Sequence, residues 1–166
     1  MHFKHIFLIL ALTAISLATW AQQQVAVFSI NDFHGAFVRN DDKGIVGAPS
    51  LWQTLDSLKR VYPYNVTVSA GDNFGGSYFY NATHGVLLPV LFNDLGIRIS
   101  SVGNHEFDDG QTSLADKWRH SPFRPKGWDI TYVSSNVRST ETGAVPPFAQ
   151  PVATTTLMLP GSKPFK

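Results

Sequence analysis

The chain has 166 residues, of which 43% are hydrophobic and 13% aromatic, so it is long enough for one domain with a substantial core and too short for two. Its net charge of +1, with only 15% charged residues, gives no electrostatic footprint, and the sequence shows neither a basic stripe nor an acidic tail for nucleic acid or membrane surfaces. Cysteine is absent, which excludes disulfides, thiol nucleophiles and thiolate metal ligands, so a metal ion would need nitrogen and oxygen ligands.

Residues 1–21 have the pattern of a secretory signal peptide. A weakly basic start precedes an apolar run over residues 6–17, and Thr19-Trp20-Ala21 resembles a small-x-small cleavage site. The apolar run is shorter than the about 20 residues that a membrane-spanning helix needs. We therefore expect an exported protein, periplasmic or extracellular, with no membrane anchor after cleavage.

The first predicted strand, residues 25–30, is apolar and β-branched and runs into the motif Asn-Asp-Phe-His-Gly. Asp32 and His34 are two residues apart, so a continued extended conformation would put both side chains on one face and Phe33 in apolar packing. Two ligands on one face can share an ion. The alternative is a turn capped by Asp32 with an ordinary loop histidine, which is commoner for an isolated Asp-x-His.

A helix is predicted over residues 50–62, because Ser50 and Gln53 have capping-box spacing and leucines recur on one face. A second strand, residues 65–69, follows and runs into a Gly-Asp-Asn motif that contains Asp72. Strand, helix and strand in this order predict a βαβ unit whose parallel strands end at the same edge of a sheet. The alternative is a turn that uses Gly-Asp only for its geometry.

The rest of the chain continues the alternation of helices and strands. We predict a helix, or two short pieces interrupted by Pro89, over residues 86–95, and a third strand over residues 97–102 that ends in Gly-Asn-His-Glu-Phe-Asp. A helix over residues 111–118 and a fourth strand over residues 130–134 follow. Three successive strand ends thus bring Asp-x-His, Asp-Asn and Asn-His to one crevice.

These polar groups are suited to divalent metal ions. Carboxylate, imidazole and amide donors favour Mn²⁺, Zn²⁺, Fe or Mg²⁺ over Cu(I). Two such ions about 3.5 to 4 Å apart form the usual clamp for phosphoryl chemistry. Asp72, on the middle of the three motifs, is the candidate for the bridging ligand.

The three motifs, in this order, resemble those of the calcineurin-like metallophosphoesterases, and the Phe107-Asp108 ending resembles the secreted 5'-nucleotidase branch. The resemblance covers roughly residues 25–136. It implies an α/β fold, the N-terminal portion of an αββα sandwich, built from βαβ units with metal ligands at the carboxyl ends of strands.

The resemblance also assigns roles to residues. It implies the metal ligands Asp32, His34, Asp72 and Asn104, and a catalytic group, His105, oriented by Asp108. A carboxylate on the other ring nitrogen of this histidine would fix its tautomer and favour its protonated form. Glu106 is expected to be a structural hydrogen-bond partner.

The implied function is hydrolysis of nucleotides or other small phosphoesters by water that two metal ions activate. The family completes its site with downstream histidines, including a Gly-His-x-His-type motif, and none follows Asn136. We therefore expect residues 22–150 to be the N-terminal part of a longer metallophosphoesterase domain, residues 151–166 to be an irregular tail, and turnover by this chain to be small. The alternative is a non-catalytic exported fragment with a weak single-metal site.

Overall fold

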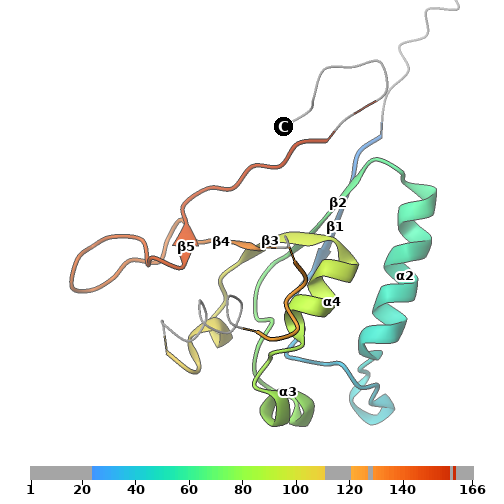
Figure 1. Ribbon diagram of the computed structural model, residues 1–166, viewed down its shortest axis with the longest axis horizontal. Coiled ribbons are helices and arrows are strands. Elements are labelled where there is room, and N and C mark those ends of the chain that lie inside the picture. Colours follow the sequence, from blue (N-terminus) through green and yellow to red (C-terminus); the bar gives the residue numbers. More distant parts are fainter. Residues whose placement is uncertain (1–23, 111–120, 127–128, 158, 160–166) are drawn as a thin grey trace, which may run out of the picture.

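The computed structural model describes residues 24–110, 121–126, 129–157 and 159. They form a five-stranded parallel sheet whose strands stand in chain order (Figure 1). The strands are β1 (Ala26–Ile30), β2 (Asn65–Ser69), β3 (Ile97–Ser101), β4 (Thr131–Val133) and β5 (Ala149–Gln150). Because neighbouring strands are parallel, their carboxyl ends meet at one edge of the sheet. The predicted α/β class and βαβ order are confirmed.

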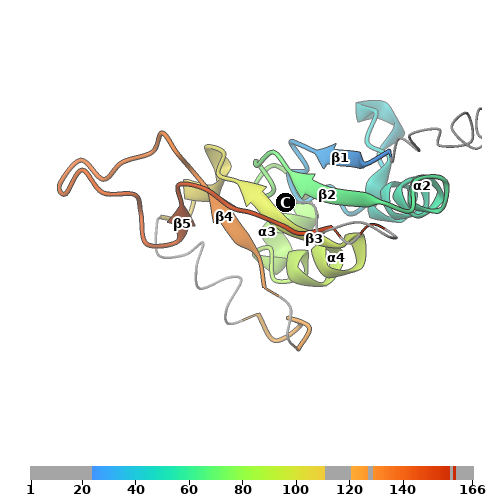
Figure 2. The same ribbon diagram turned by 90° about the horizontal axis from the view of Figure 1, so that it is seen from above.

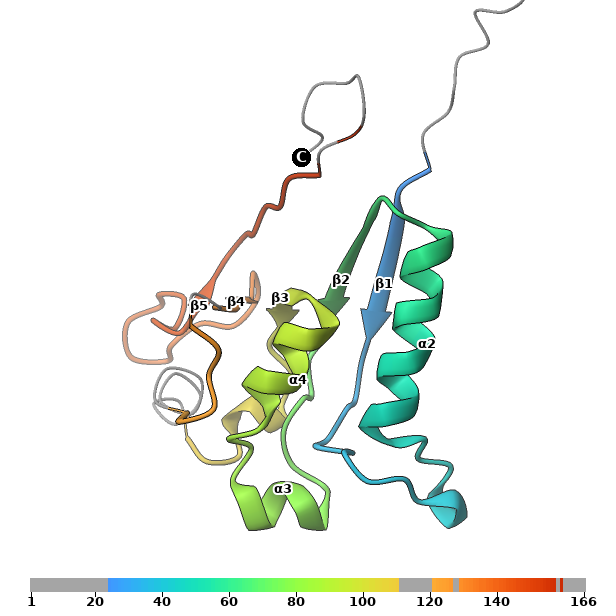
Figure 3. The ribbon, with the colours of Figure 1, turned by 45° about the vertical axis from the view of Figure 1, so that its right-hand side comes forward.

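The α-helices of the described residues lie in the connections between the first three strands. Helix α2 (Gly47–Val61) joins β1 to β2, and α3 (Tyr78–Thr83) and α4 (Leu88–Leu95) join β2 to β3. Right-handed crossovers between strands in sequential order place their helices on one side of a sheet. Helices α2 and α4 accordingly cover the same face and contact each other (Figures 2 and 3).

The core lies between this face of the sheet and the helices. Its fully buried side chains include Leu88, Phe92 and Leu95 of α4 and Ile97 of β3. Helix α4 has Pro89 in its first turn and ends at Gly96 in a left-handed conformation, which is the usual placement of these two residue types at helix ends. Pro89 therefore opens the helix rather than interrupting it.

The opposite face of the sheet carries a second set of apolar side chains, because residues alternate between the two faces of a strand. Val27 pairs with Val66 in register and is 65% exposed, while Val68 and Val133 are half-buried. The described residues thus form one sheet with helices on one face, which corresponds to one half of the layered sandwich that the resemblance implies.

The start of α2 differs from the prediction. The helix begins at Gly47 rather than at Ser50, and its N-cap, Val46, makes no side-chain hydrogen bond, so the predicted capping box between Ser50 and Gln53 is wrong. The N–H of Ala48 donates instead to a backbone carbonyl of the preceding loop. A cap made by backbone groups leaves no side-chain signature in a sequence.

Two short elements, α3 and β5, are not predicted from the sequence. Helix α3 begins after Ser77, whose hydroxyl accepts a hydrogen bond from the N–H of Tyr80 at 2.9 Å. It has six residues, too few for a helical period to appear. Strand β5 has two residues and is defined by its pairing with β4, which only the tertiary fold reveals.

Some predictions concern residues that the structure does not describe. The signal peptide over residues 1–21 and the helix over residues 111–118 lie outside the described residues, as does part of the tail over residues 151–166. The boundaries of the predicted domain, residues 22–150, stay a prediction. Within the described ranges, no helix combines the length and apolar character needed to cross a membrane.

Truncation of the central side chain of α4 tests the core. Phe92→Ala should lower the free energy of unfolding by about 3 to 5 kcal/mol, because it removes a fully buried ring and leaves a cavity. Val61→Ala, at a position that is 67% exposed, should change it by less than about 0.5 kcal/mol. Urea unfolding followed by circular dichroism measures both, and equal effects of the two substitutions would contradict this assignment of the core.

Candidate metal centre

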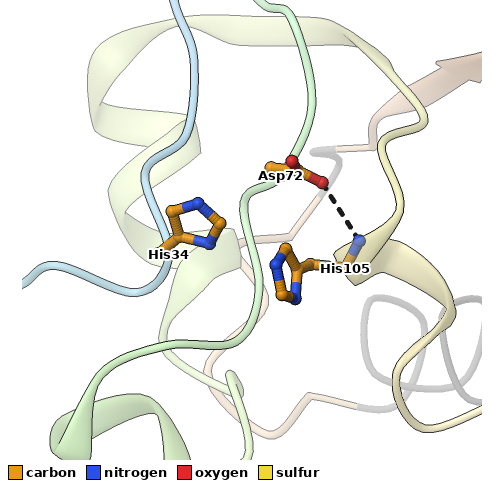
Figure 4. Close-up of side chains that lie close together, drawn as sticks. All are labelled: His34, Asp72 and His105. Carbon is orange, nitrogen blue, oxygen red and sulfur yellow. Dashed lines mark hydrogen bonds between the residues drawn. The ribbon is translucent and has the colours of Figure 1, made fainter.

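The loops that follow β1, β2 and β3 bring three side chains together. His34, Asp72 and His105 each offer one ligand atom, and these atoms lie within 4.8 Å of one another. Figure 4 shows the three side chains around a common space, each coming from a different segment of the chain. The adjacency of β1, β2 and β3 explains this convergence, since their ends stand side by side at one edge of the sheet.

Two further predicted ligands lie close by. The Oδ1 atom of Asp32 is 3.6 Å from Nε2 of His34, too far for a hydrogen bond. Asn104 is exposed and precedes the short 3-10 helix η2 (His105–Phe107), which its side chain does not cap. The structure therefore joins His34 and Asp72 to His105, with Asp32 beside them, and the metal roles of Asp32 and Asn104 stay predictions.

Three of the predicted ligands have a left-handed backbone. The φ angles of Asp32, His34 and Asp72 are 49°, 48° and 51°, and within the described residues His84 is the one other non-glycine residue with positive φ. Asp, Asn and His occupy this region more often than other side chains do, and such strain collects at functional sites. A continued extended conformation from Asp32 to His34, the condition for both side chains to share one face, is therefore not met, although Phe33 is buried, 7% exposed, as expected.

The ring of His34 is held by the loop after β2. Its Nδ1 lies 3.1 Å from the carbonyl oxygen of Phe74. A carbonyl oxygen only accepts, so Nδ1 must carry the proton and donate. This contact leaves the lone pair of Nε2 for a ligand, which is the arrangement that metal-binding histidines commonly have.

His105 has a carboxylate partner of its own. Its Nδ1 lies 2.7 Å from Oδ2 of Asp108, and its ring meets the His34 ring edge to face with centroids 4.8 Å apart. The hydrogen bond to Asp108 raises the pKa of His105 above its ordinary value, against a smaller opposing effect of desolvation, and the negative charges of Asp72 and Glu106 add to the rise. The contact is the one that the resemblance implies, and the catalytic role of the pair stays a prediction.

Hydrogen bonds in both directions join the loop after β2 to the turn after β3. The N–H of His105 donates to Oδ1 of Asp72 at 3.0 Å, the dashed line in Figure 4. In the other direction, the carboxylate of Glu106, which is 3% exposed, accepts from the N–H groups of Asp72 at 3.0 Å and Asn73 at 2.8 Å. It also accepts from the N–H of Gly103 at 2.7 Å and the side-chain amide of Asn73 at 3.0 Å.

The two segments also touch backbone to backbone. A Cβ atom at Gly103 would overlap the carboxylate of Asp72, and one at Gly71 would lie 2.8 Å from the N atom of Gly103. Real Cβ atoms do not approach other atoms so closely. Glycine at both positions is therefore needed for the neighbouring loop to fit.

Removal of the charge on Asp108 should lower the pKa of His105. In Asp108→Asn the ring loses its anionic partner, so the pKa should fall from its raised value and the imidazole should become neutral at lower pH. The titration of the His105 ring, followed by NMR in the metal-free protein, measures this change. Asp109→Asn is the matched control, since that carboxylate accepts from the Tyr80 hydroxyl. An unchanged His105 pKa in Asp108→Asn would contradict the assignment.

A methyl group at Gly103 should disrupt the contact between the loops. Gly103→Ala should lower the free energy of unfolding by about 3 kcal/mol or more, the upper end of the usual cost of overpacking, because the methyl group meets the Asp72 carboxylate. Gly143→Ala is the control, because its Cβ meets no atom within 4 Å and its cost comes only from the positive φ. Chemical unfolding of both variants measures the difference, and a Gly103→Ala protein as stable as the parent would refute the close contact.

Comparison with known proteins finds similarity to 5'-nucleotidases and apyrases. No protein-family model matches the chain. A bovine (Bos taurus) 5'-nucleotidase is 26% identical over 117 residues, which are 65% of this chain and 20% of that protein. An apyrase from Tabanus yao is 30% identical over 94 residues, 51% of this chain and 17% of the apyrase. The chain thus spans about a fifth of the length of the curated relatives that it matches.

Solved structures show the same fold. A 5'-nucleotidase precursor from Thermus thermophilus superposes with a TM-score of 0.62 at 23% identity, over 79% of this chain and 26% of that one. A calcineurin-like phosphoesterase from Bacillus subtilis superposes with a TM-score of 0.58 at 19% identity, over 84% of this chain and 44% of that one. The chain is therefore a relative of the 5'-nucleotidases and apyrases, and it has the fold of the N-terminal part of a calcineurin-like phosphoesterase.

Proposed function

We propose that this chain carries part of the active site of a metal-dependent phosphoester hydrolase that acts on nucleotides outside the cytoplasm. The observation that carries the proposal is the convergence of His34, Asp72 and His105 at the ends of three adjacent parallel strands. Support for nucleotides comes from the 5'-nucleotidases among the relatives. Support for export comes from the signal-peptide pattern of residues 1–21 and from the structural relative described as a precursor.

The donor set fits divalent metal ions. Imidazole nitrogens and carboxylate oxygens suit Mn²⁺, Zn²⁺ or Fe, and the oxygen donors also suit Mg²⁺. We assign Asp32, His34, Asp72 and Asn104 to two ions, with Asp72 between them because β2 stands between β1 and β3. Bound ions would lower the pKa of coordinated water and neutralise charge on the attacked phosphoryl group.

His105 would supply a proton or hydrogen bond to the phosphoester. Its Nδ1 faces Asp108, so Nε2 is the ring atom left to face a substrate. The raised pKa of His105 keeps the ring protonated over a wider pH range, and a positioned acid of this kind typically accelerates a reaction by about 10² to 10⁴. Asp108 acts through His105 by holding its ring and its tautomer.

A second function is favoured by one feature of the same site. The three clustered donors include His105 itself, so a single ion could take that histidine as a ligand and leave no acid for catalysis. The chain would then be a non-catalytic, exported metal-binding protein. The two functions differ in the number of ions bound and in phosphate release.

Metal titration tests the site that both functions share. Mn²⁺ added to the full chain in a calorimeter should bind, and Asp72→Asn should weaken binding by more than about tenfold, since even changes to the partners of metal ligands cost 10- to 100-fold. Asp56→Asn is the matched control, because that carboxylate pairs with Arg60 on α2. Equal Mn²⁺ affinities in the parent and Asp72→Asn would refute the assignment of the ligands.

Phosphate release then separates the two functions. The Mn²⁺- and Zn²⁺-loaded chain is assayed on nucleoside monophosphates and on a chromogenic phosphomonoester. The hydrolase predicts that two ions bind and that release, although small in this chain, depends on metal and falls at least about 10²-fold in His105→Gln. Binding of one ion without release supports the non-catalytic function instead.

A further inference from the structure

We propose that Glu106 is a positioning residue of the metal site, and that its buried carboxylate holds the backbone of Asp72 so that the Asp72 side chain faces His34 and His105. The inference rests on the proposed metal site and extends it to a residue that contributes no ligand atom to the group. Glu106 lies two residues beyond Asn104 in the turn after β3, whereas Asp72 follows β2, so the effect acts between two loops.

The surroundings of Glu106 are those of a carboxylate built into the fold. Its side chain is 3% exposed and accepts four hydrogen bonds, two on each oxygen. Oε2 accepts from the N–H groups of Asp72 and Gly103 at 3.0 and 2.7 Å. Oε1 accepts from the N–H of Asn73 at 2.8 Å and from the Asn73 side-chain amide at 3.0 Å. A buried ion of this kind is stable only when its lone pairs are satisfied, as they are here.

The segment that Glu106 holds has an unfavourable backbone conformation. Asp72 has φ of 51° and the preceding Gly71 has φ of 100°, and a left-handed conformation costs an ordinary L-residue free energy. Hydrogen bonds to the N–H groups of Asp72 and Asn73 fix the peptide units on both sides of the Asp72 Cα. They therefore fix the direction in which its side chain leaves the backbone.

The same contacts link the positions of Asp72 and His105. The N–H of His105 donates to Oδ1 of Asp72, and Glu106, the next residue, accepts from the N–H of Asp72. A shift of either loop breaks both hydrogen bonds. Glu106 thus sets the spacing between two of the three clustered donors.

The side chain of Asn73 is a second buried polar group, and it connects Glu106 to the sheet. The Asn73 side chain is fully buried, donates to the hydroxyl of Ser100 at 2.9 Å and accepts from the hydroxyl of Ser69 at 2.6 Å. These serines stand on β3 and β2. The hydrogen bonds therefore run from the sheet through Asn73 to Glu106, and the loop is anchored to the strands from which the ligands project.

The pattern of donors predicts that the position of Asp72 depends on the carboxylate of Glu106, whose two oxygens both accept, and not only on the size of the side chain. Glutamine has nearly the same shape, but its NH₂ group would replace one oxygen and face two N–H donors. In Glu106→Gln, one pair of N–H groups would lose its acceptor, either those of Asp72 and Gly103 or those of Asn73. The loop should then move away, and Asp72 with it.

The test compares Glu106→Gln with Leu55→Ala in the full chain. Leu55 is a buried residue of α2, so its truncation destabilises the same fold through the core rather than through the loops. Two measurements are made at a temperature where both variants are folded by circular dichroism. One is the affinity for Mn²⁺, and the other is amide hydrogen exchange by NMR in the metal-free protein.

For Glu106→Gln we expect Mn²⁺ affinity to fall about 10- to 100-fold, with faster exchange concentrated at the amides of Asp72, Asn73 and Gly103. Leu55→Ala should keep the parent affinity and speed exchange throughout the chain. Parent-like affinity in Glu106→Gln, or equal losses in both variants, would overturn the proposal, because a purely structural role predicts one of these results. If Glu106→Gln does not fold, Glu106→Asp takes its place, because it keeps the charge but shortens the side chain by one methylene. The same loss of Mn²⁺ affinity and the same faster exchange at the three amides are then expected, and parent-like affinity or losses equal to those of Leu55→Ala would overturn the proposal.

The two measurements also separate this inference from the proposed function. A parent chain that binds no Mn²⁺ refutes the metal site. In that case, faster exchange confined to the three amides in Glu106→Gln would still support the holding of Asp72 by Glu106, and unchanged exchange at those amides would overturn it.

Discussion

Two sets of hydrogen bonds run in opposite directions between the loop after β2 and the turn after β3. The side chain of Asp72 accepts a hydrogen bond from the N–H of His105, and the N–H of Asp72 donates one to the carboxylate of Glu106. Each loop is therefore both donor and acceptor to the other, and neither can be repositioned independently. The close approach of Gly71 to Gly103 is the steric condition for this exchange, because a side chain at either glycine would push the loops apart.

Aromatic residues next to the predicted ligands anchor the segments that follow β1, β2 and β3 to the core. Phe33 and Phe74 are buried, and Phe107 meets Phe148 edge to face at a centroid distance of 5.6 Å. Each motif therefore places an apolar ring within two residues of a donor. The carbonyl of Phe74 also accepts from His34, so burial of one ring helps to orient a predicted ligand that follows another strand. Rigid loops at a sheet edge are what a preorganised metal site requires.

The sequence predicts the parallel sheet and the convergence of the three motifs because apolar strands alternate with a helical pattern, and chain order then determines which strand ends meet. It does not predict the left-handed backbone at Asp32 and His34, since an Asp-x-His spacing looks the same in extended and turned conformations. Nor does it predict the start of α2, where backbone groups make the cap. Three of the four hydrogen bonds of Glu106 come from Asp72 and Asn73, in a loop 33 and 34 residues earlier, and no local pattern encodes that contact.

The positive φ angles of Asp32, His34 and Asp72 also limit how the site could change over evolutionary time. Glycine, asparagine, aspartate and histidine tolerate this backbone better than other residues do. A replacement of aspartate by glutamate would keep the negative charge but would add backbone strain and lengthen the side chain. A lineage that lost the proposed metal site would therefore pass most easily through asparagine or glycine at these positions, and the loops would keep their shape without a bound ion.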